Sequence, residues 1–478
     1  MAQEITITRK GHLLMIEPPM ELLLRPHLTY VRVQMDKNEQ FTSEKVAIYG
    51  LDGNRLVTLA GFFERIVKVF DEMGYEYKVE DLRPQNPRLK PHVNRIPGKL
   101  RDDQIDALKA IITHDHGIIV APTAYGKSHL IRLICSIYPY ARIVICVPGI
   151  AMLDNYARRL LETIPKDDIG ILGGGKHDDE KRITVVTKAS LGRAPLRHCD
   201  MLLFDEVHQA AAQSVFTALS ELNGAKAFGF TASPKGRSDR AEKRIEAIFG
   251  PVIFSYEYED AVNAGSISQI RVIAYRVDKG PNVSQYKRRS TRMRKGIWYN
   301  NYRNRLIAHI TRLEEFRDKQ MLVYVSTAQH AIVLGKYMPD FEICYDRLSP
   351  ASYSRLLSQG IIDDSFPKEL SVSERRRIQV GFESGEIRKV IVTPMWNVGV
   401  DFTNLEVLIR ADAGFGEIDN IQVPGRLSRL ADGKEVGILV DFEDEFDPYF
   451  VRRWAARRRS YASRGWEICR RQLTLSND

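Results

Sequence analysis

The chain has 478 residues, which is too long for one ordinary domain and predicts about three. Its composition, with 44% hydrophobic and 27% charged residues, is ordinary for a soluble globular protein, and no apolar run approaches the roughly 20 residues of a membrane span. The net charge of +9 favours a polyanionic partner.

Residues 1–95 are predicted to form a small α/β unit. An Asp-Gly pair, Asp52-Gly53, lies between two apolar runs, which is typical of a β-hairpin. A stretch with helical spacing of apolar residues follows and stops at Gly74. The expected strands, helix and final strand are Val46–Tyr49, Arg55–Leu59, 62–73 and Tyr75–Val79. The proline-rich stretch Leu82–Gly98 is a natural linker.

Short apolar runs alternate with helical patterns through the rest of the chain. Short, continuous apolar runs are typical of strands in parallel sheets buried on both faces. We expect one such α/β unit from Leu100 to about Ser266, with strands at 117–121, 142–147, 183–187, 200–204 and 226–230. A second unit is expected to have strands at 320–325, 341–345, 388–393, 405–409 and 435–441.

A strand followed by Gly-Lys-Ser points to a phosphate-binding loop in the first unit. The loop Ala121–Ser128 follows an apolar run and precedes a helical pattern. Gly126 permits close approach of a phosphate, and the helix start adds its positive dipole end. Lys127 is predicted to neutralise phosphate charge and Ser128 to ligate magnesium. The one departure from the usual pattern is Ala121, which replaces the first glycine.

A second apolar run ends in Asp205-Glu206-Val207-His208. Asp205 is expected to hold Mg²⁺, directly or through water. Glu206 is expected to polarise the attacking water as a general base. His208 is placed to link the nucleotide site to the neighbouring domain. Beside Lys127, this acidic turn predicts a site that hydrolyses nucleoside triphosphates.

These patterns resemble those of superfamily 2 helicases, in the family's order, over about residues 97–445. The matching segments include the adenine-reading Q-type motif, the phosphate loop, the Asp-Glu turn and the arginine-containing motif VI. In order, the segments are Leu100–Gln104, Ala121–Ser128, Val147-Pro148 with Asn155, Thr184–Leu191, Asp205–His208, Thr231–Pro234, Val323–Thr327, Thr393–Asp401 and Gln422–Arg429.

The resemblance implies ATP and Mg²⁺ as cofactors and a role for each matching residue. Catalysis is assigned to Lys127, Asp205, Glu206, Gln422, Arg426 and Arg429. Nucleotide binding is assigned to Arg101, Gln104, Thr123, Ala124, Tyr125, Gly126, Lys127, Ser128, Gly399 and Asp401, and metal binding to Ser128 and Asp205. Coupling of the nucleotide site to the rest of the protein is assigned to His208, Thr231 and Ser233. Contact with nucleic acid is assigned to Pro148, Thr187, Ser326, Thr327 and Thr393.

The resemblance also implies a fold and a substrate. The expected fold is two tandem RecA-like parallel-sheet domains, 96–270 and 271–478, after an α/β accessory domain, 1–95. Within the superfamily the chain is similar to phage branch-migration helicases of the UvsW type, with a RecG-like function. The expected partner is therefore DNA, in the form of forks or four-way junctions. The segment Leu348–Pro367 exceeds the compact pattern and has no assigned role.

Three features leave more than one interpretation. Arg426 and Arg429 lie three residues apart, so a helix would place them on one face, as a charge-stabilising pair or as a surface pair. The strand-end hydroxyls, including Ser190, suit phosphate contact or turn capping. Lys287–Lys295 fits a phosphate-binding loop or a solvated connector, and Arg452–Arg471 fits a nucleic-acid-binding basic tail or a packed C-terminal helix.

The sequence also fits other functional classes. A double-strand translocase that does not separate strands, an RNA helicase and a scaffold with a vestigial ATP site are the alternatives. The five scattered cysteines contain no CxxC pair, so no disulfide framework or structural metal site is expected. No signal-peptide pattern is seen, and we expect a reduced, cytoplasmic location.

Overall fold

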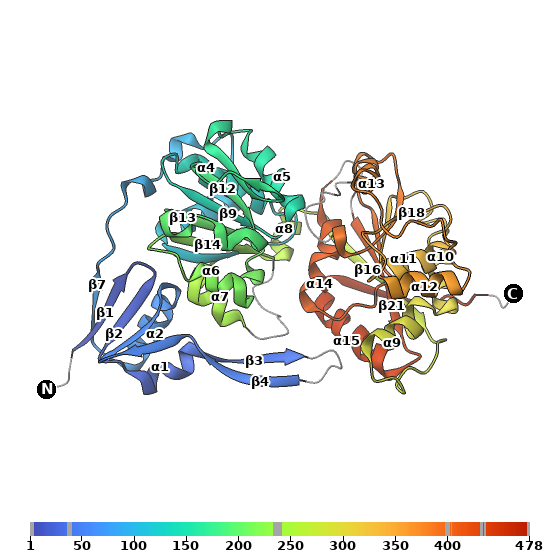
Figure 1. Ribbon diagram of the computed structural model, residues 1–478, viewed down its shortest axis with the longest axis horizontal. Coiled ribbons are helices and arrows are strands. Elements are labelled where there is room, and N and C mark those ends of the chain that lie inside the picture. The colour runs from blue at the N-terminus through green and yellow to red at the C-terminus, as the bar shows by residue number, and fades with distance from the viewer. Residues whose placement is uncertain are drawn as a thin grey trace. The chain divides into compact units, whose positions relative to one another are not determined.

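The structure, a computed structural model, describes residues 4–35, 41–232, 241–396, 402, 404–430, 434 and 436–475. The chain divides into two units (Figure 1). Unit 1 comprises Met1–Gln34 and Phe41–Glu257, and unit 2 comprises Met35–Gln40 and Tyr258–Asp478. Each unit contains a large sheet that is parallel except for one edge strand in unit 1, which confirms the predicted α/β class with tandem parallel sheets.

Unit 1 begins with a five-stranded sheet of order β5-β6-β2-β1-β7, whose strand pairs are antiparallel except for β1 and β7. The strands are β1 (Ile5–Lys10), β2 (Leu13–Glu17), β5 (Tyr49–Asp52), β6 (Arg55–Leu59) and β7 (Tyr77–Asp81). Two helices pack beside them, α1 (Glu21–Leu28) and α2 (Phe63–Met73). A separate two-stranded ribbon consists of β3 (Thr29–Met35) and β4 (Phe41–Ala47).

The predicted helix is confirmed, but the predicted hairpin is displaced. Helix α2 ends at Gly74, which adopts a left-handed φ of 70°. Asp52 pairs directly with Arg55, so the turn is Gly53-Asn54 and the first strand of the hairpin is β5. The expected strand Val46–Tyr49 is therefore wrong. Val46 belongs to β4, because a two-residue turn brings Tyr49–Asp52, not the earlier residues, opposite β6.

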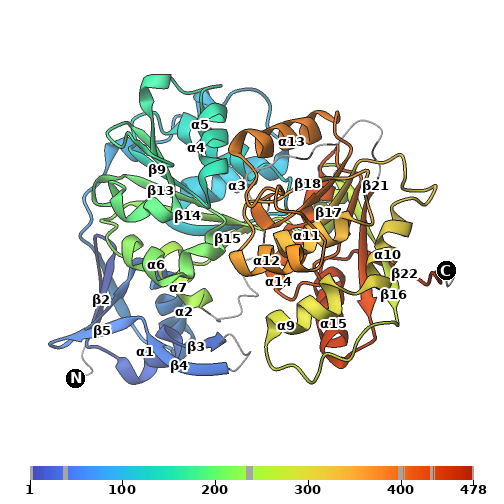
Figure 2. The same cartoon turned by 45° about the vertical axis from the view of Figure 1, so that its right-hand side comes forward.

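The large sheet of unit 1 has eight strands in the order β11-β10-β12-β9-β13-β14-β8-β15. Helices α3, α4 and α5 pack on one face, and α6 and α7 cover the other (Figures 1 and 2). The helices are α3 (Asp102–Thr113), α4 (Lys127–Ile137), α5 (Ile150–Leu160), α6 (Gln213–Leu219) and α7 (Glu242–Phe249). The strands are β8 (His116–Val120), β9 (Ile143–Val147), β10 (Ile169–Gly173), β11 (Lys176–His177), β12 (Ile183–Thr187), β13 (Met201–Asp205), β14 (Lys226–Thr231) and β15 (Val252–Ser255).

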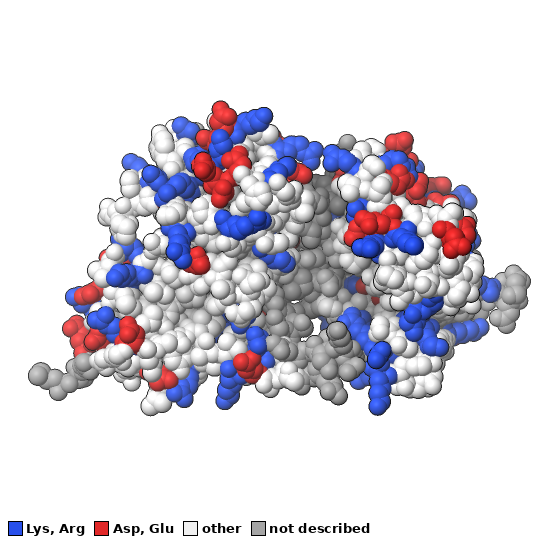
Figure 3. Space-filling model, viewed as in Figure 1, with Lys and Arg blue, Asp and Glu red and all other residues white. Residues whose placement is uncertain are grey.

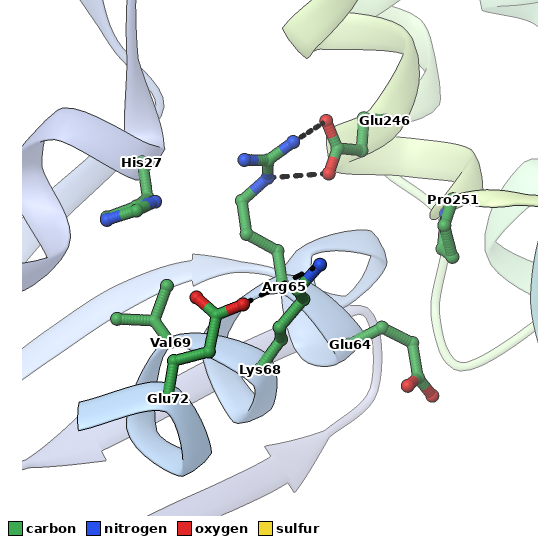
Figure 4. A pocket seen from close by; sticks show the side chains of 8 residues that line it. All are labelled: His27, Glu64, Arg65, Lys68, Val69, Glu72, Glu246 and Pro251. Atoms are coloured by element: carbon green, nitrogen blue, oxygen red, sulfur yellow. Dashed lines mark hydrogen bonds and ion pairs between the residues drawn. The ribbon is translucent and has the colours of Figure 1, made fainter. Parts of the chain in front are cut away.

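The N-terminal sheet and the large sheet of unit 1 share one hydrophobic core. That core runs from Ile7 and Phe70 in the N-terminal part to Phe249 at the end of α7. In the view of Figure 4, Arg65 of α2 reaches Glu246 of α7, and its Nε and Nη2 atoms donate to the two carboxylate oxygens at 2.6 and 2.7 Å. The N-terminal part is therefore fixed to the α7 face of the large sheet.

Substitution of Gly61 tests how tightly the N-terminal part packs against α7. A Cβ atom at Gly61 lies 2.2 Å from the backbone oxygen of Glu246. Because neither backbone can yield locally, Gly61→Ala should destabilise unit 1 by about 1–3 kcal/mol, measured by scanning calorimetry. Gly50→Ala is the matched control, since nothing lies within 4 Å of its Cβ position. Equal unfolding temperatures for the two variants would show that the junction is loose.

Unit 2 has a seven-stranded, all-parallel sheet of order β18-β19-β17-β20-β21-β16-β22. The strands are β16 (Gln269–Val277), β17 (Met321–Tyr324), β18 (Glu342–Cys344), β19 (Lys389–Val392), β20 (Val407–Arg410), β21 (Val436–Asp444) and β22 (Glu467–Arg471). The helices are α8 (Tyr258–Asn263), α9 (Arg289–Met293), α10 (Asn301–Ile310), α11 (Ala328–Gly335), α12 (Pro350–Ser358), α13 (Val372–Ser384), α14 (Glu417–Gln422) and α15 (Pro448–Ala462).

The two basic stretches and the long insert are folded parts of unit 2. Residues 287–295 include α9 and lead into a π-helical turn, whose Ile297 is buried in a small hydrophobic cluster with Met293. Arg452–Arg471 spans most of α15 together with β22, and Trp454 and Trp466 are buried. The packed-helix interpretation of this stretch therefore holds for these residues. The insert Leu348–Pro367 contains α12 and packs Leu348 and Leu356 into a small core.

Candidate nucleotide site and strand groove

The phosphate loop follows β8 and ends at the start of α4. Two of its residues adopt left-handed backbone angles, Ala124 with φ 70° and Gly126 with φ 105°. Such a turn directs successive N–H groups into one concave surface, which suits the oxygens of a phosphate. Lys127 donates from Nζ to the carbonyls of Ala121 and Pro122 at 2.9 and 3.0 Å, so its ammonium group lies over the loop.

The Q-type residues lie against the same loop. The guanidinium of Arg101 donates to the carbonyl of Tyr125 at 3.2 Å and lies 5.2 Å from the centre of the Tyr125 ring. Gln104 is buried and accepts from the backbone N–H of Arg101. Tyr256, which the sequence did not indicate, packs its ring 5.3 Å from that of Tyr125. Together these groups form one wall beside the phosphate loop.

The two carboxylates lie at the carboxyl end of β13, next to the end of β14. Asp205 is buried, and its Oδ1 accepts from the backbone N–H of Glu206 at 3.0 Å. Glu206 has a left-handed φ of 53°, which is uncommon for a side chain with a Cβ and recurs at functional sites. The turn thereby places two adjacent carboxylates at the carboxyl end of β13.

Tyr156 of α5 is a site residue that sequence reasoning missed. Its hydroxyl donates to Oδ2 of Asp205 at 2.6 Å, and Ser128 interacts with the same hydroxyl. Ser128 and Asp205, the two expected Mg²⁺ ligands, therefore meet around one phenol. A hydroxyl and a carboxylate are oxygen ligands of the kind that Mg²⁺ prefers, so the residues present fit this metal.

Burial raises the pKa of Asp205 to about 6, and the charge of Glu206 acts in the same direction. The hydrogen bond from Tyr156 lowers this pKa. Because a metal ligand must be deprotonated, Asp205 would hold Mg²⁺ less readily as the pH falls through this raised pKa.

Replacement of Tyr156 by phenylalanine should therefore weaken Mg²⁺ binding. Without the phenol the pKa of Asp205 rises further, and the carboxylate loses its orienting partner. We expect Tyr156→Phe to raise the Mg²⁺ concentration for half-maximal ATPase activity by about 10-fold at pH 7, and by more at pH 6. Tyr140→Phe, at an exposed position in unit 1, is the control. An unchanged Mg²⁺ requirement in Tyr156→Phe would contradict this role.

The coupling residues form a chain from the carboxylates to β14. His208 Nδ1 lies 3.4 Å from Glu206 Oε2 and 3.4 Å from Thr231 Oγ1. Both His208 and Thr231 are buried. A change at the γ-phosphate position can thus reach β14 through side-chain contacts. Ser233, the third residue predicted to couple, lies outside the described residues, as do Gly399 and Asp401.

The arginine segment differs from the prediction in one respect. Gln422 ends α14, and Arg426 lies in the short 3-10 helix Pro424–Ser428. Arg429 is the first residue after that helix and has an extended backbone, with φ −70° and ψ 135°. The expected placement of Arg426 and Arg429 on one helical face is therefore wrong, because the helix stops at Ser428, whose hydroxyl donates to the Gly425 carbonyl.

Known proteins resemble this chain in a domain family, in overall sequence and in fold. Residues 97–236 match the family model described as "Type III restriction enzyme, res subunit". The DNA 3'-5' translocase XPB2 of Sulfurisphaera tokodaii is 26% identical over 361 residues, which cover 70% of this chain and 79% of the relative. Among solved structures, Saccharomyces cerevisiae Dbp5 bound to RNA and ADP BeF3 aligns over 84% of this chain and 95% of its own, at 15% identity and a TM-score of 0.54.

The chain is similar to the helicases of superfamily 2. The predicted resemblance is thereby confirmed, as are the fold of two RecA-like domains and the activity of an ATP-hydrolysing helicase. The crystal structure of bacteriophage T4 UvsW aligns over 98% of this chain and 99% of its own, at 17% identity and a TM-score of 0.43. No helix among the described residues has the length and apolar character to cross a membrane.

The predicted nucleic-acid contacts of this helicase differ in their accessibility. In unit 1, Thr187 is buried and donates to Ser190, which also accepts from Arg193, so both hydroxyls are engaged within the protein. Pro148, at the end of β9, is half-buried. In unit 2, Thr393 is buried just after β19.

Ser326 and Thr327 line a groove at the carboxyl edge of the unit 2 sheet. The groove has a volume of about 350 Å³, and it lies beyond the ends of β17, β19 and β20, where open α/β sheets bind their ligands. Its lining also includes Arg289, Ser290, Met293, Trp298, Tyr324, Pro394, Asp412, Gly414, Phe415, Gly416 and Arg453. The sequence therefore identified two of its hydroxyls and placed Arg289 and Arg453 in basic stretches, but it did not indicate Trp298 or Phe415.

Proposed function

We propose that this helicase is an ATP-driven DNA motor that remodels branched DNA, by unwinding or regressing forks or by moving four-way junctions. The contact chain from Asp205 through Glu206 and His208 to Thr231 carries the motor assignment. The name of the relative XPB2, a DNA 3'-5' translocase, supports DNA as the substrate and 3'-5' as the direction.

Each group of the nucleotide site has a distinct task in this proposal. Lys127 and the loop N–H groups hold the β- and γ-phosphates, and Glu206 orients a water molecule and accepts its proton. Ser128 and Asp205 would hold Mg²⁺, which would neutralise charge on the phosphates when bound. Because Thr231 contacts His208, loss of the γ-phosphate can shift β14 and so convert hydrolysis into movement.

Grip on DNA is assigned to unit 2. Figure 3 shows Lys and Arg side chains in the region of α9 and α15. In these parts of the chain, the exposed cations include Lys287, Arg288, Arg458 and Arg459. Contacts of this kind are independent of sequence, so binding should weaken steeply as salt rises.

The preference for branched DNA is assigned to the N-terminal part. The ribbon of β3 and β4 carries exposed side chains such as Val31 and Lys45, outside the core that fixes the N-terminal sheet to α7. Deletion of residues 1–95 would expose that core, so replacement of the ribbon, residues 31–45, by a two-residue turn is the cleaner test.

ATPase rates with single-stranded, duplex, forked and four-way DNA and with structured RNA test this proposal. We expect the four-way junction and the fork to stimulate the full chain most. The ribbon replacement should reduce junction remodelling at least several-fold more than it reduces ATPase activity on linear DNA. Stimulation by duplex DNA without any strand separation would favour a double-strand translocase. Better stimulation by RNA than by any DNA would favour an RNA helicase.

A further inference from the structure

We infer that the unit 2 groove binds one nucleotide of a single DNA strand, with the Arg453 guanidinium on its phosphodiester and its base stacked on Phe415. This inference rests on the proposed function, since it identifies which form of DNA the groove recognises. Arg453 comes from the C-terminal helix α15, and Phe415 from the loop between β20 and α14.

Arg453 is a buried cation that forms no ion pair within the described part of the chain, although the more distant charge of Asp412 acts on it. Its exposed fraction is 4%, and it donates to two neutral oxygens, the Ala413 carbonyl at 2.8 Å and the Tyr449 hydroxyl at 3.2 Å. Among the described residues no carboxylate lies within ion-pair distance of it. Burial lowers the pKa of Arg453 to about 10.

Three other buried arginines of unit 2 each form an ion pair, unlike Arg453. Each is held by an aspartate, in the pairs Arg303–Asp444, Arg410–Asp412 and Arg457–Asp441, at 2.7 or 2.8 Å. Asp412 also lines the groove, but its carboxylate is held by two hydrogen bonds from Arg410. A buried unpaired charge is costly, and an anion in the groove would provide the missing partner.

The groove around Arg453 has the chemistry of a phosphate site. Arg289 lies close enough for its charge to depress the pKa of Arg453, so two cations face one cavity. The Ser326 hydroxyl accepts from Trp298 Nε1 at 3.0 Å, which leaves its own proton for an acceptor in the groove. A guanidinium fork with hydroxyl donors matches the oxygens of a phosphodiester.

Phe415 supplies the surface for a base. Its side chain is 49% exposed, with one side close to Arg453, whose guanidinium carbon lies 5.5 Å from the ring centre. A Cβ at Gly414 would lie 2.3 Å from Arg410 Nη2, so only glycine lets the chain pass over that ion pair and present the ring. Bases of a duplex are stacked inside it, so the exposed ring favours a single strand.

Binding of a fluorescein-labelled oligo-dT strand and of a matched duplex to the full chain tests this pocket. Phe415→Ala should raise the Kd for the single strand about 10-fold and the Kd for the duplex less than about 2-fold. Phe415→Trp should restore single-strand binding. If Phe415→Ala raises the Kd for both ligands equally, or raises neither, the stacking role is wrong.

Arg453→Gln should weaken single-strand binding and make the slope of log Kd against log salt shallower by about 0.7, the loss of one phosphate contact. Arg317→Gln, at an exposed position of unit 2 that is paired with Asp318, should leave single-strand affinity within about 2-fold. If Arg453→Gln unfolds unit 2, Arg453→Lys, which keeps the charge, should bind and fold. An unchanged slope in a folded Arg453→Gln protein would overturn the phosphate role.

The wild-type measurements separate this inference from the proposed function. If no nucleic acid binds the wild-type chain or stimulates its ATPase, the DNA-motor proposal fails. If DNA stimulates the wild type while Phe415→Ala and Arg453→Gln bind both ligands normally, only the single-strand pocket fails.

Discussion

Glu206→Gln should bind ATP but hydrolyse it about 10³-fold more slowly than the wild type, a barrier increase of about 4 kcal/mol. Glutamine has nearly the same shape as glutamate. The left-handed backbone at position 206 and the contact of its side chain with His208 should therefore be kept. The amide, however, cannot accept the proton of the attacking water. Steady-state ATPase rates and equilibrium binding of a fluorescent ATP analogue separate the two effects.

Two further variants serve as a control and as a comparison for Glu206→Gln. Glu221→Gln changes an exposed carboxylate in unit 1 whose partner is Arg197, and it should hydrolyse ATP at the wild-type rate. Lys127→Ala should instead weaken nucleotide binding itself, because Lys127 lies over the phosphate loop. Turnover by Glu206→Gln within a few-fold of the wild type would remove Glu206 as the general base.

Loss of either motif VI arginine should lower DNA-stimulated ATPase activity by about 10³-fold or more if that arginine stabilises charge on the γ-phosphate. Arg426 and Arg429 belong to unit 2, whereas Lys127 and Glu206 belong to unit 1. We propose that the two units close on ATP to complete the site. The effect of Arg426→Ala or Arg429→Ala should appear in kcat, measured at saturating ATP and DNA.

A structural contribution of Arg426 has to be separated from this effect. Arg426 is buried, with its guanidinium 5.4 Å from the centre of the Phe402 ring, so alanine also removes packing. Arg426→Lys keeps a cation without the guanidinium fork and serves as the second variant. Arg271→Ala removes an exposed pair with Glu467 and is the control for surface charge. Normal kcat in both Arg426→Ala and Arg429→Ala would contradict an arginine acting on the phosphate.

The sequence predicted the centre of the nucleotide site because that centre is local. Lys127 and Asp205 each follow a short apolar run that could only be a buried strand, and parallel strands bring their carboxyl ends to one edge. Among the strands that were not predicted, β10 contains two glycines, and β22 carries charged residues at half-buried or exposed positions. Both patterns lack a continuous apolar run.

Residues that reach the sites from distant segments were not predictable. Tyr156 lies 49 positions before Asp205, and nothing in the sequence around it indicates that its hydroxyl meets a carboxylate. Arg453 belongs to a stretch of arginines in which Arg457 has a buried aspartate partner and Arg458 is exposed. Only the tertiary fold distinguishes the three, because their surroundings come from β20, β21 and the loop before α14.

The most direct test compares the ATPase rate of the full chain with that of residues 1–257, each with and without a four-way DNA junction. Unit 1 contains both of its hydrophobic cores and the whole phosphate loop, so the fragment should fold and bind ATP. The junction should accelerate hydrolysis only in the full chain, because the arginines and the strand groove lie in unit 2. Equal stimulation of the fragment would contradict a motor whose ATP site requires both units.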